Sequence, residues 1–296
     1  MLRQLVLQTP AKINLSLDMT GKRPDGYHTL RSVFQAVGIY DRLTFTRIAP
    51  DQPLTLTCND PDVPCDARNL VWKAAAALLG ENPCGAAINL EKHIPSQAGM
   101  GGGSSDCAAA LLGMRRLLSL PHTDAQLHAI AAKLGADVSF FLEGGTVLCE
   151  GIGEIMTILP DMPVREVIMA KGNAGISTPE GYRRLDALQI QPPLCTDQVL
   201  EHLQDDADTL FSVCGNWFDA VTDLPEVEQI REIMRANGIR PVLSGSGAAV
   251  FGGCGREARP EQCLAALREA GFGFAERLQT VNCGAVILSE RFDEES

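Results

Sequence analysis

The residue types with the clearest chemical potential lie between positions 95 and 107, which read Pro-Ser-Gln-Ala-Gly-Met-Gly-Gly-Gly-Ser-Ser-Asp-Cys. Apolar residues at helical spacing follow this segment. Glycines let the backbone turn tightly and bring its N–H groups close to a ligand. The helix behind them offers further free N–H groups and the positive end of its dipole. We therefore predict an anion-binding loop, and the most common biological anion of that shape is a nucleotide phosphate.

The common nucleotide motifs do not describe this loop. It contains no Gly-x-x-x-x-Gly-Lys-Ser/Thr sequence, which excludes a Walker P-loop, and its spacing is not Gly-x-Gly-x-x-Gly. Ser104, Ser105 and Asp106 supply hydroxyls and a candidate N-cap for the helix. Cys107 lies in the first helical turn, where the dipole favours a thiolate, although a buried apolar thiol is the alternative. The alternative interpretation is that the whole segment is a flexible Gly/Ser turn. The segment is in register with a long apolar helix, which disfavours this alternative.

Two single residues also carry chemistry. Lys12 lies at the entrance of a predicted strand, among small and apolar neighbours, and Asp137 follows Gly135, where a predicted helix stops. Taken alone, Lys12 is more often an exposed lysine at a strand end, and Asp137 is as readily a helix N-cap. The segment Ser244-Gly-Ser-Gly247 reads by itself as an ordinary turn. Separately, none of the three indicates a function.

Composition narrows the function class. The formal net charge of the 296 residues is −12 and no basic stripe is present, which argues against binding nucleic acid through its phosphates. The ten cysteines form no Cys-x-x-Cys pair, so neither a zinc site nor a redox pair is supported. Their apolar contexts suit a reducing compartment. Because the sequence shows no secretory signal and no 18-residue apolar run, we expect a cytoplasmic protein without a membrane span.

Strand-like and helix-like segments are mixed along the chain, which predicts an α+β fold rather than a doubly wound parallel sheet. The chain length predicts two domains, and the proline-rich segment at 160–163 places the boundary between residues 1–162 and 163–296. The predicted elements are strands at 2–8 and 13–19 with a break at 9–12, a hairpin over 43–58, a helix at 69–80, a strand at 86–92, helices at 123–134 and 209–221, and a closing strand at 285–288.

Taken together and in order, three segments resemble the galactokinase, homoserine kinase, mevalonate kinase and phosphomevalonate kinase (GHMP) superfamily: Pro10-Ala-Lys-Ile-Asn-Leu15, Pro95 through Ser105, and Leu243-Ser-Gly-Ser-Gly-Ala248. Within it, the chain is similar to the family that phosphorylates 4-diphosphocytidyl-2-C-methyl-D-erythritol. That similarity extends from about residue 8 to residue 290 and includes Gly135–Val138 and Glu150–Glu154. The block Asp25-Gly-Tyr-His28 is its most specific part, because sister kinases lack it.

The resemblance implies an N-terminal, ribosomal-S5-like ATP-binding domain and a C-terminal ferredoxin-like domain, with both substrates in the cleft. It implies transfer of the ATP γ-phosphate to the tertiary 2-hydroxyl of the small-molecule substrate 4-diphosphocytidyl-2-C-methyl-D-erythritol, a step of the non-mevalonate isoprenoid pathway. It also implies ATP and Mg²⁺ as cofactors, and no obligate protein partner is evident.

The resemblance further implies a role for each matching residue. Asp137 would accept the hydroxyl proton, and Lys12 beside it would keep Asp137 ionised and steady the transferring phosphoryl group. Ser104 or Ser105 would bind Mg²⁺, and no carboxylate ligand for the metal is identified. The expected ATP-binding residues are Asn69 and Lys92 at the base, and the loop residues Pro95, Ser96, Gln97, Ala98, Gly99, Met100, Gly101, Gly102, Gly103, Ser104 and Ser105.

On the substrate side, Tyr27 would stack on the cytosine, His28 would hydrogen-bond to its edge and Tyr182 would cover its other face. The remaining substrate-binding residues expected from the matching motifs are Asn14, Thr178 and Gly245. Two alternatives remain open at this point. A sister small-molecule kinase is disfavoured by the Asp25–His28 block, and a catalytically inactive binding relative is disfavoured by the intact Lys12 and Asp137.

Overall fold

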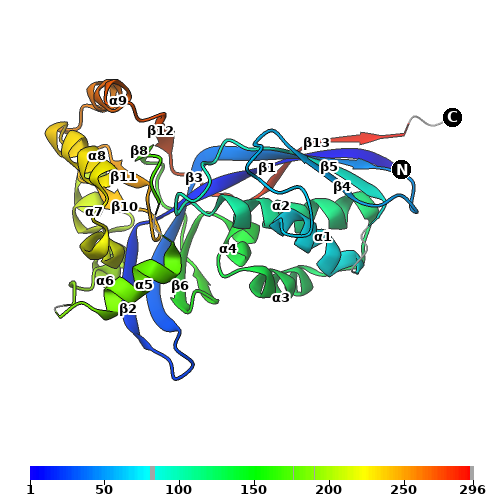
Figure 1. The fold of residues 1–296 in the computed structure, drawn as a ribbon, viewed down its shortest axis with the longest axis horizontal. Helices are drawn as coiled ribbons and strands as arrows, with labels where there is room; N and C mark the ends of the chain where they lie inside the picture. Colours follow the sequence, from blue (N-terminus) through cyan, green and yellow to red (C-terminus); the bar gives the residue numbers. More distant parts are fainter. Residues whose placement is uncertain (81–83, 176, 190, 294–296) are drawn as a thin grey trace.

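In the computed structural model, which describes residues 1–80, 84–175, 177–189 and 191–293, the strands form two sheets (Figure 1). The smaller sheet has the order β10-β11-β8-β12, formed by β8 (Glu166–Lys171), β10 (Val242–Leu243), β11 (Val250–Gly253) and β12 (Phe274–Gln279). The larger sheet is formed by β1 (Leu2–Asn14), β2 (Ser16–Lys22), β3 (His28–Arg47), β4 (Thr55–Cys58), β5 (Ala86–Glu91), β6 (Thr146–Gly151), β7 (Ile155–Ile158), β9 (Gly215–Asn216) and β13 (Val286–Phe292).

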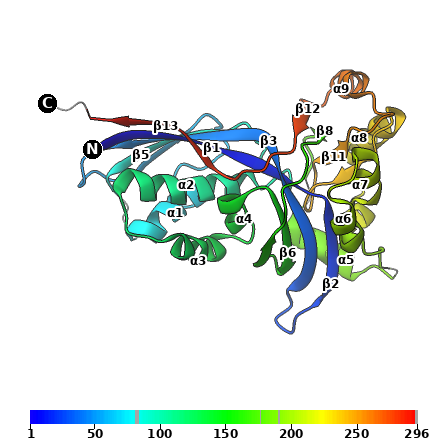
Figure 2. The ribbon, with the colours of Figure 1, turned by 180° about the vertical axis from the view of Figure 1, so that it is seen from behind.

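Four helices cover one face of the larger sheet: α1 (Leu70–Leu79), α2 (Gly102–Leu118), α3 (Asp124–Leu134) and α4 (Val138–Glu143). The others accompany the smaller sheet and the end of the β2–β3 hairpin (Figure 2). They are α5 (Thr178–Asp186), α6 (Thr196–His202), α7 (Ala207–Val213), the 3₁₀ helix η1 (Trp217–Val221), α8 (Pro225–Ala236) and α9 (Pro260–Glu269). This mixture confirms the α+β class. None of the helices in the described part of the chain combines the length and hydropathy needed to cross a bilayer.

The predicted break at residues 9–12 is wrong, because β1 runs unbroken from Leu2 to Asn14. Its pairing with β3 shifts register between Pro10 and Ala11. A proline has no N–H to give to a strand ladder, and such an irregularity accommodates it. The strand therefore carries Lys12 into the interior, where its side chain is buried.

The predicted hairpin over residues 43–58 is also wrong. β5 lies between the two segments, since it pairs antiparallel with β3 and parallel with β4. A parallel pair needs a crossover connection, and α1 supplies it here. The helix predicted at 209–221 is in fact α7, then β9, then η1, and the side chain of Asn216 caps η1 by accepting from the N–H of Phe218.

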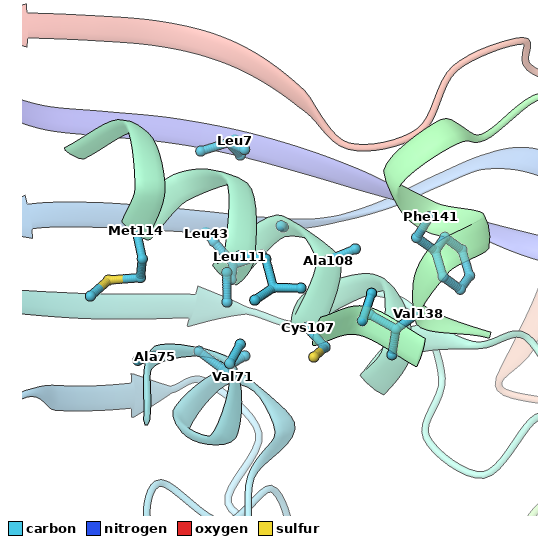
Figure 3. Close-up of a cluster of buried hydrophobic side chains, with 14 of the residues drawn as sticks. Leu7, Leu43, Val71, Ala75, Cys107, Ala108, Leu111, Met114, Val138 and Phe141 are labelled. Atoms are coloured by element: carbon cyan, nitrogen blue, oxygen red, sulfur yellow. The ribbon is translucent and has the colours of Figure 1, made fainter. Parts of the chain in front are cut away.

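The core between the helices and the larger sheet explains why α1 and α2 lie where they do (Figure 3). Leu111 and Met114 of α2 are fully buried against strand residues such as Leu7 and Leu43. Asn69 caps α1 through the N–H of Val71, and a capping box of Thr123 and Gln126 begins α3. Packing thus fixes the start of α2, and with it the end of the glycine-rich loop.

The end of the chain returns to the first sheet. β13 pairs antiparallel with β1, and just beyond it the N–H of Asp293 donates to the carbonyl oxygen of Met1 (Figure 1). The final strand therefore belongs to the sheet that the first 162 residues mostly build. The division at residue 162 stays a prediction.

Candidate active site

The glycine-rich loop enters α2 through left-handed backbone that only glycine adopts without strain. Gly99 has φ +72° and Gly101, the N-cap of α2, has φ +73°. A Cβ at Gly99 would lie 2.0 Å from the carbonyl oxygen of Ser244, and one at Gly101 would lie 2.6 Å from the ring of Phe141. Asp106 is therefore not an N-cap, since it lies within the helix and is buried.

Beside the loop is an open cavity of about 410 Å³. Its walls contain every predicted ATP-binding residue except Ser105. Sequence reasoning missed five further lining residues: Val63, Pro64, Arg68, Leu70 and Asp106. The last three adjoin predicted residues in the sequence, whereas Val63 and Pro64 carried no such signal.

Ser105 is unsuited to the metal role that the resemblance implied. Its side chain is fully buried, and its Oγ lies 2.5 Å from the carbonyl oxygen of Pro10 and 2.6 Å from Oγ1 of Thr9. The hydroxyl instead ties the first turn of α2 to β1. Ser104 is half-buried and lines the cavity, so of the two serines it alone remains a candidate.

Lys12 and Asp137 come together at the inner end of the loop. Nζ of Lys12 lies 3.7 Å from Oδ2 of Asp137 and 2.6 Å from Oδ1 of Asn14, and it faces the ring of Phe34 at 4.5 Å. Burial lowers the pKa of Lys12, and Asp137 partly offsets that effect. The N–H of Lys12 donates to the carbonyl oxygen of Met100 at 3.0 Å, which joins the pair to the glycine-rich loop.

The carboxylate of Asp137 remains available for chemistry. Asp137 stands at the N-cap position of α4, yet its side chain makes no capping hydrogen bond. About a third of that side chain is exposed, whereas Lys12 is almost fully buried. The carboxylate can therefore meet both Lys12 and an incoming hydroxyl.

Asn14 is fully engaged within the protein rather than open to a ligand. Its Oδ1 accepts from Lys12 and, at 2.8 Å, from the N–H of Gly245, while its Nδ2 donates to Ser32 at 2.9 Å. The predicted substrate contact through Asn14 is thus replaced by a positioning role. The side chain holds Lys12 and connects β1 to the loop at residues 244–247.

The predicted cytosine-binding residues are arranged differently from the expected sandwich of Tyr27 and Tyr182. The rings of His28 and Tyr182 stack on each other with centroids 4.7 Å apart, whereas Tyr27 is 62% exposed. Phe218 packs edge-on against Tyr182. Burial raises the pKa of Tyr182, and the charge of Asp137 adds to the rise.

Asp186 is a member of this group that sequence reasoning missed, although its place four residues after Tyr182 on α5 was a usable signal. Its Oδ1 lies 2.7 Å from Nε2 of His28, and its Oδ2 accepts from Lys22 at 2.6 Å. Those hydrogen bonds hold the pKa of Asp186 below its usual value. Thr178, at the start of α5, contacts Oγ of Ser246 at 2.9 Å.

The thiolate hypothesis for Cys107 is wrong. The side chain is fully buried in the core behind the loop, and burial raises its pKa to about 12 (Figure 3). Desolvation therefore outweighs the dipole of α2.

Comparison with known proteins decides the family. Residues 69–145, which include most of the cavity wall and Asp137, match the model of the GHMP kinases N terminal domain. The chain is 38% identical over 293 residues to the 4-diphosphocytidyl-2-C-methyl-D-erythritol kinase of Geobacillus kaustophilus, covering 97% of this chain and 98% of that protein. The chain belongs to this kinase family.

Solved structures agree with that assignment. A crystal structure of 4-(cytidine 5'-diphospho)-2C-methyl-D-erythritol kinase is similar with a TM-score of 0.73 and 32% identity, covering 93% of this chain and 98% of that chain. A homoserine kinase from Cytophaga hutchinsonii has a TM-score of 0.72 at 17% identity, covering 96% and 97%. At that identity the second likeness shows the GHMP kinase fold alone.

Proposed function

We propose that the protein transfers the γ-phosphate of ATP to the 2-hydroxyl of 4-diphosphocytidyl-2-C-methyl-D-erythritol, a step in making isoprenoid precursors. The observation that carries this proposal is the Lys12–Asp137 pair, 3.7 Å apart and joined to the glycine-rich loop through Met100. The curated relatives that span nearly the whole chain bear the name of this kinase, which supports the choice of substrate.

In this mechanism Asp137 accepts the proton of the substrate hydroxyl as its oxygen attacks the γ-phosphorus. A new P–O bond forms to the substrate, the bond from the γ-phosphorus to the bridging β-phosphate oxygen breaks, and ADP leaves. Lys12 keeps Asp137 ionised and offsets negative charge on the phosphoryl group as it moves. The glycine-rich loop places its backbone N–H groups along the triphosphate, because phosphoryl transfer depends mostly on positioning and electrostatics.

The donor set fits a Mg²⁺ ion that is held chiefly by the nucleotide. Ser104 lines the cavity, whereas the described residues contain no cluster of three or more His, Cys, Asp or Glu side chains arranged for a metal. Mg²⁺ commonly keeps several waters and binds through substrate phosphates with few protein ligands. Such an ion would neutralise charge on the phosphates, and Ser104 would orient them.

The cytidine end of the substrate would bind at His28 and Tyr182. Their rings already stack on each other, so we expect the base to contact the edge of His28 and the exposed ring of Tyr27. Binding energy gathered there would position a hydroxyl group some distance away at Asp137. We place the reaction in the cytoplasm, in keeping with ten free thiols.

An assay of ADP release from the purified protein tests this proposal. We expect turnover with ATP, Mg²⁺ and the cytidine substrate, and very little with methylerythritol phosphate, homoserine or mevalonate. Faster turnover of homoserine or mevalonate would contradict the substrate assignment. ATP binding without turnover of any of these alcohols would favour an inactive relative instead.

A further inference from the structure

The two ends of the glycine-rich loop meet in a buried cluster of charges that takes no direct part in the proposed phosphoryl transfer. Lys92, which follows β5 and precedes the loop, lies between two carboxylates. Its Nζ donates to Oδ2 of Asp106 on α2 at 2.8 Å and also to Oδ2 of Asp41 on β3. The side chains of Lys92, Asp41 and Asp106 are 6%, 0% and 5% exposed, so solvent screens these contacts very little.

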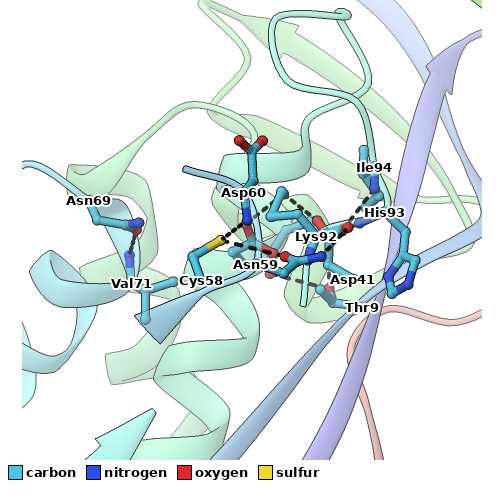
Figure 4. A network of polar contacts seen from close by, with 12 residues as sticks. Thr9, Asp41, Cys58, Asn59, Asp60, Asn69, Val71, Lys92, His93 and Ile94 are labelled. Atoms are coloured by element: carbon cyan, nitrogen blue, oxygen red, sulfur yellow. Dashed lines mark hydrogen bonds and ion pairs between the residues drawn. The ribbon is translucent and has the colours of Figure 1, made fainter. Parts of the chain in front are cut away.

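Of the two carboxylates, Asp41 accepts more hydrogen bonds than Asp106. Besides the ammonium of Lys92, it accepts from the N–H of His93 at 2.6 Å and from the N–H of Ile94 at 2.9 Å, both through Oδ1 (Figure 4). These two N–H groups begin the segment that becomes the loop. A carboxylate that accepts several N–H bonds is stabilised in its charged form and fixes the backbone that supplies them.

Asp106 is the less satisfied of the two carboxylates. It accepts only from Lys92, and its Oδ1 is buried with no hydrogen-bond partner among the described residues. One ammonium faces two carboxylates, so the cluster holds more negative than positive charge if all three groups are ionised. Because Asp106 and Lys92 also line the cavity, this excess would lie beside the proposed nucleotide.

We propose that Asp41 is a positioning residue for the nucleotide site, acting through a loop clamp formed by Asp41, Lys92, the N–H groups of His93 and Ile94, and Asp106. This role rests on the proposed function, since it is for ATP that the loop is positioned. Asp41 fixes the entrance of the loop directly, and Lys92 joins that entrance to α2 at its exit. Asp106 contributes shape to the clamp, and its negative charge is not required.

Two matched substitutions separate the carboxylates. Asp41→Asn and Asp106→Asn each replace one oxygen by an amide, at nearly constant volume and within the same cluster. We expect Asp41→Asn to turn an amide toward either Lys92 or the loop N–H groups, and to raise the KM for ATP on the order of tenfold, as loss of a charge-assisted hydrogen bond does. The KM for the cytidine substrate should change much less. Asp106 lines the cavity, so Asp106→Asn removes negative charge beside the nucleotide and should lower the KM for ATP.

Hydrogen exchange provides a readout that does not depend on activity, and the measurement on the wild-type protein does not depend on either variant folding. In the wild-type protein without ATP, the N–H groups of His93 and Ile94 should exchange slowly, because Asp41 already binds them. Those of residues 99–103 should slow only when ATP is added. In Asp41→Asn the first pair should exchange faster, and in Asp106→Asn it should not.

The outcomes are distinct. Equal increases in the KM for ATP in the two variants, or fast exchange at His93 and Ile94 in the wild-type protein, would overturn the clamp. A wild-type protein that neither binds ATP nor turns over the cytidine substrate, but shows the slow exchange, would overturn the proposed function and leave the clamp standing. A fall in kcat with both KM values unchanged in Asp41→Asn would show a structural role without any positioning of ATP.

Discussion

Lys12 and Lys92 are both buried beside aspartates, yet their surroundings differ in the balance of charge. Lys12 has one carboxylate at 3.7 Å, and burial lowers its pKa. Burial acts on Lys92 in the same direction, but Asp106 and Asp41 outweigh it and raise the pKa of Lys92. The charge of Lys92 is therefore satisfied within the protein, whereas that of Lys12 is only partly compensated. Lys12 is therefore suited to bind an anion that enters the site and whose charge is redistributed during a reaction.

Loss of the carboxylate beside Lys12 should give the largest effect on catalysis. Asp137→Asn keeps the size of the side chain and removes the base, so turnover should fall about 10²–10⁴-fold. The KM for ATP should stay close to the wild-type value. Steady-state kinetics of the purified variant would check this. Near-normal turnover would mean that Asp137 does not accept the proton.

Removing Lys92 should destabilise the protein, whereas removing Lys12 should not. Lys92→Met leaves two buried carboxylates without their cation, and breaking a buried pair in this way costs about 3–5 kcal/mol of unfolding free energy. Lys12→Met removes a charge whose burial is unfavourable and leaves Asp137 partly exposed to water, so the change should be small or stabilising. Urea unfolding of both variants measures the difference. A comparable loss in the two would contradict the distinction between them.

The glycine-rich loop should be sensitive to substitution at particular glycines only. Gly99→Ala combines left-handed backbone with a Cβ only 2.0 Å from the carbonyl oxygen of Ser244, so it should cost about 1–3 kcal/mol or more and weaken ATP binding. Gly273→Ala is the control, because Gly273 does not line the cavity and its Cβ would meet nothing within 4 Å. Calorimetry with ATP on both variants checks this. Unchanged affinity in Gly99→Ala would reduce the loop to a turn.

The cytidine side should respond separately from the ATP side. His28→Ala removes the stacking partner of Tyr182 and the contact of Asp186, and should lower kcat/KM for the cytidine substrate by the equivalent of about 1–3 kcal/mol. The KM for ATP should not change. Tyr27→Ala should lower the same kcat/KM by a similar amount, because its exposed ring is expected to contact the base. If His28→Ala changed only the KM for ATP, the Asp25–His28 block would not lie at the cytidine site.

Local patterns in the sequence predicted the parts of the site that are themselves local. The glycine-rich loop, the helix α3 and the strand leading to Lys92 each depend on residues within a few positions. For these parts, the spacing of the residue types already shows what the backbone must do. Gly99 and Gly101, for example, stand where the loop needs left-handed backbone. The resemblance to a known family added Lys12 and Asp137, which no local pattern would have joined.

What the sequence did not predict depends on contacts between distant segments. The insertion of β5 between β3 and β4 and the continuity of β1 through Pro10 follow from strand pairing across the sheet. The stacking of His28 on Tyr182 and the burial of Ser105 depend likewise on which elements meet. Propensity and spacing describe a segment by itself, so they hold no information on such partners.

The central claim is that the partly compensated charge of Lys12 stabilises the phosphoryl group during the chemical step. The most direct test is the rate of phosphoryl transfer in a single turnover, with ATP and the cytidine substrate both saturating, in Lys12→Met and wild-type protein of equal folded fraction. The account predicts a transfer rate reduced about 10²-fold or more, as for loss of one charge-stabilising donor. An unchanged transfer rate, with only the KM for ATP raised, would contradict it.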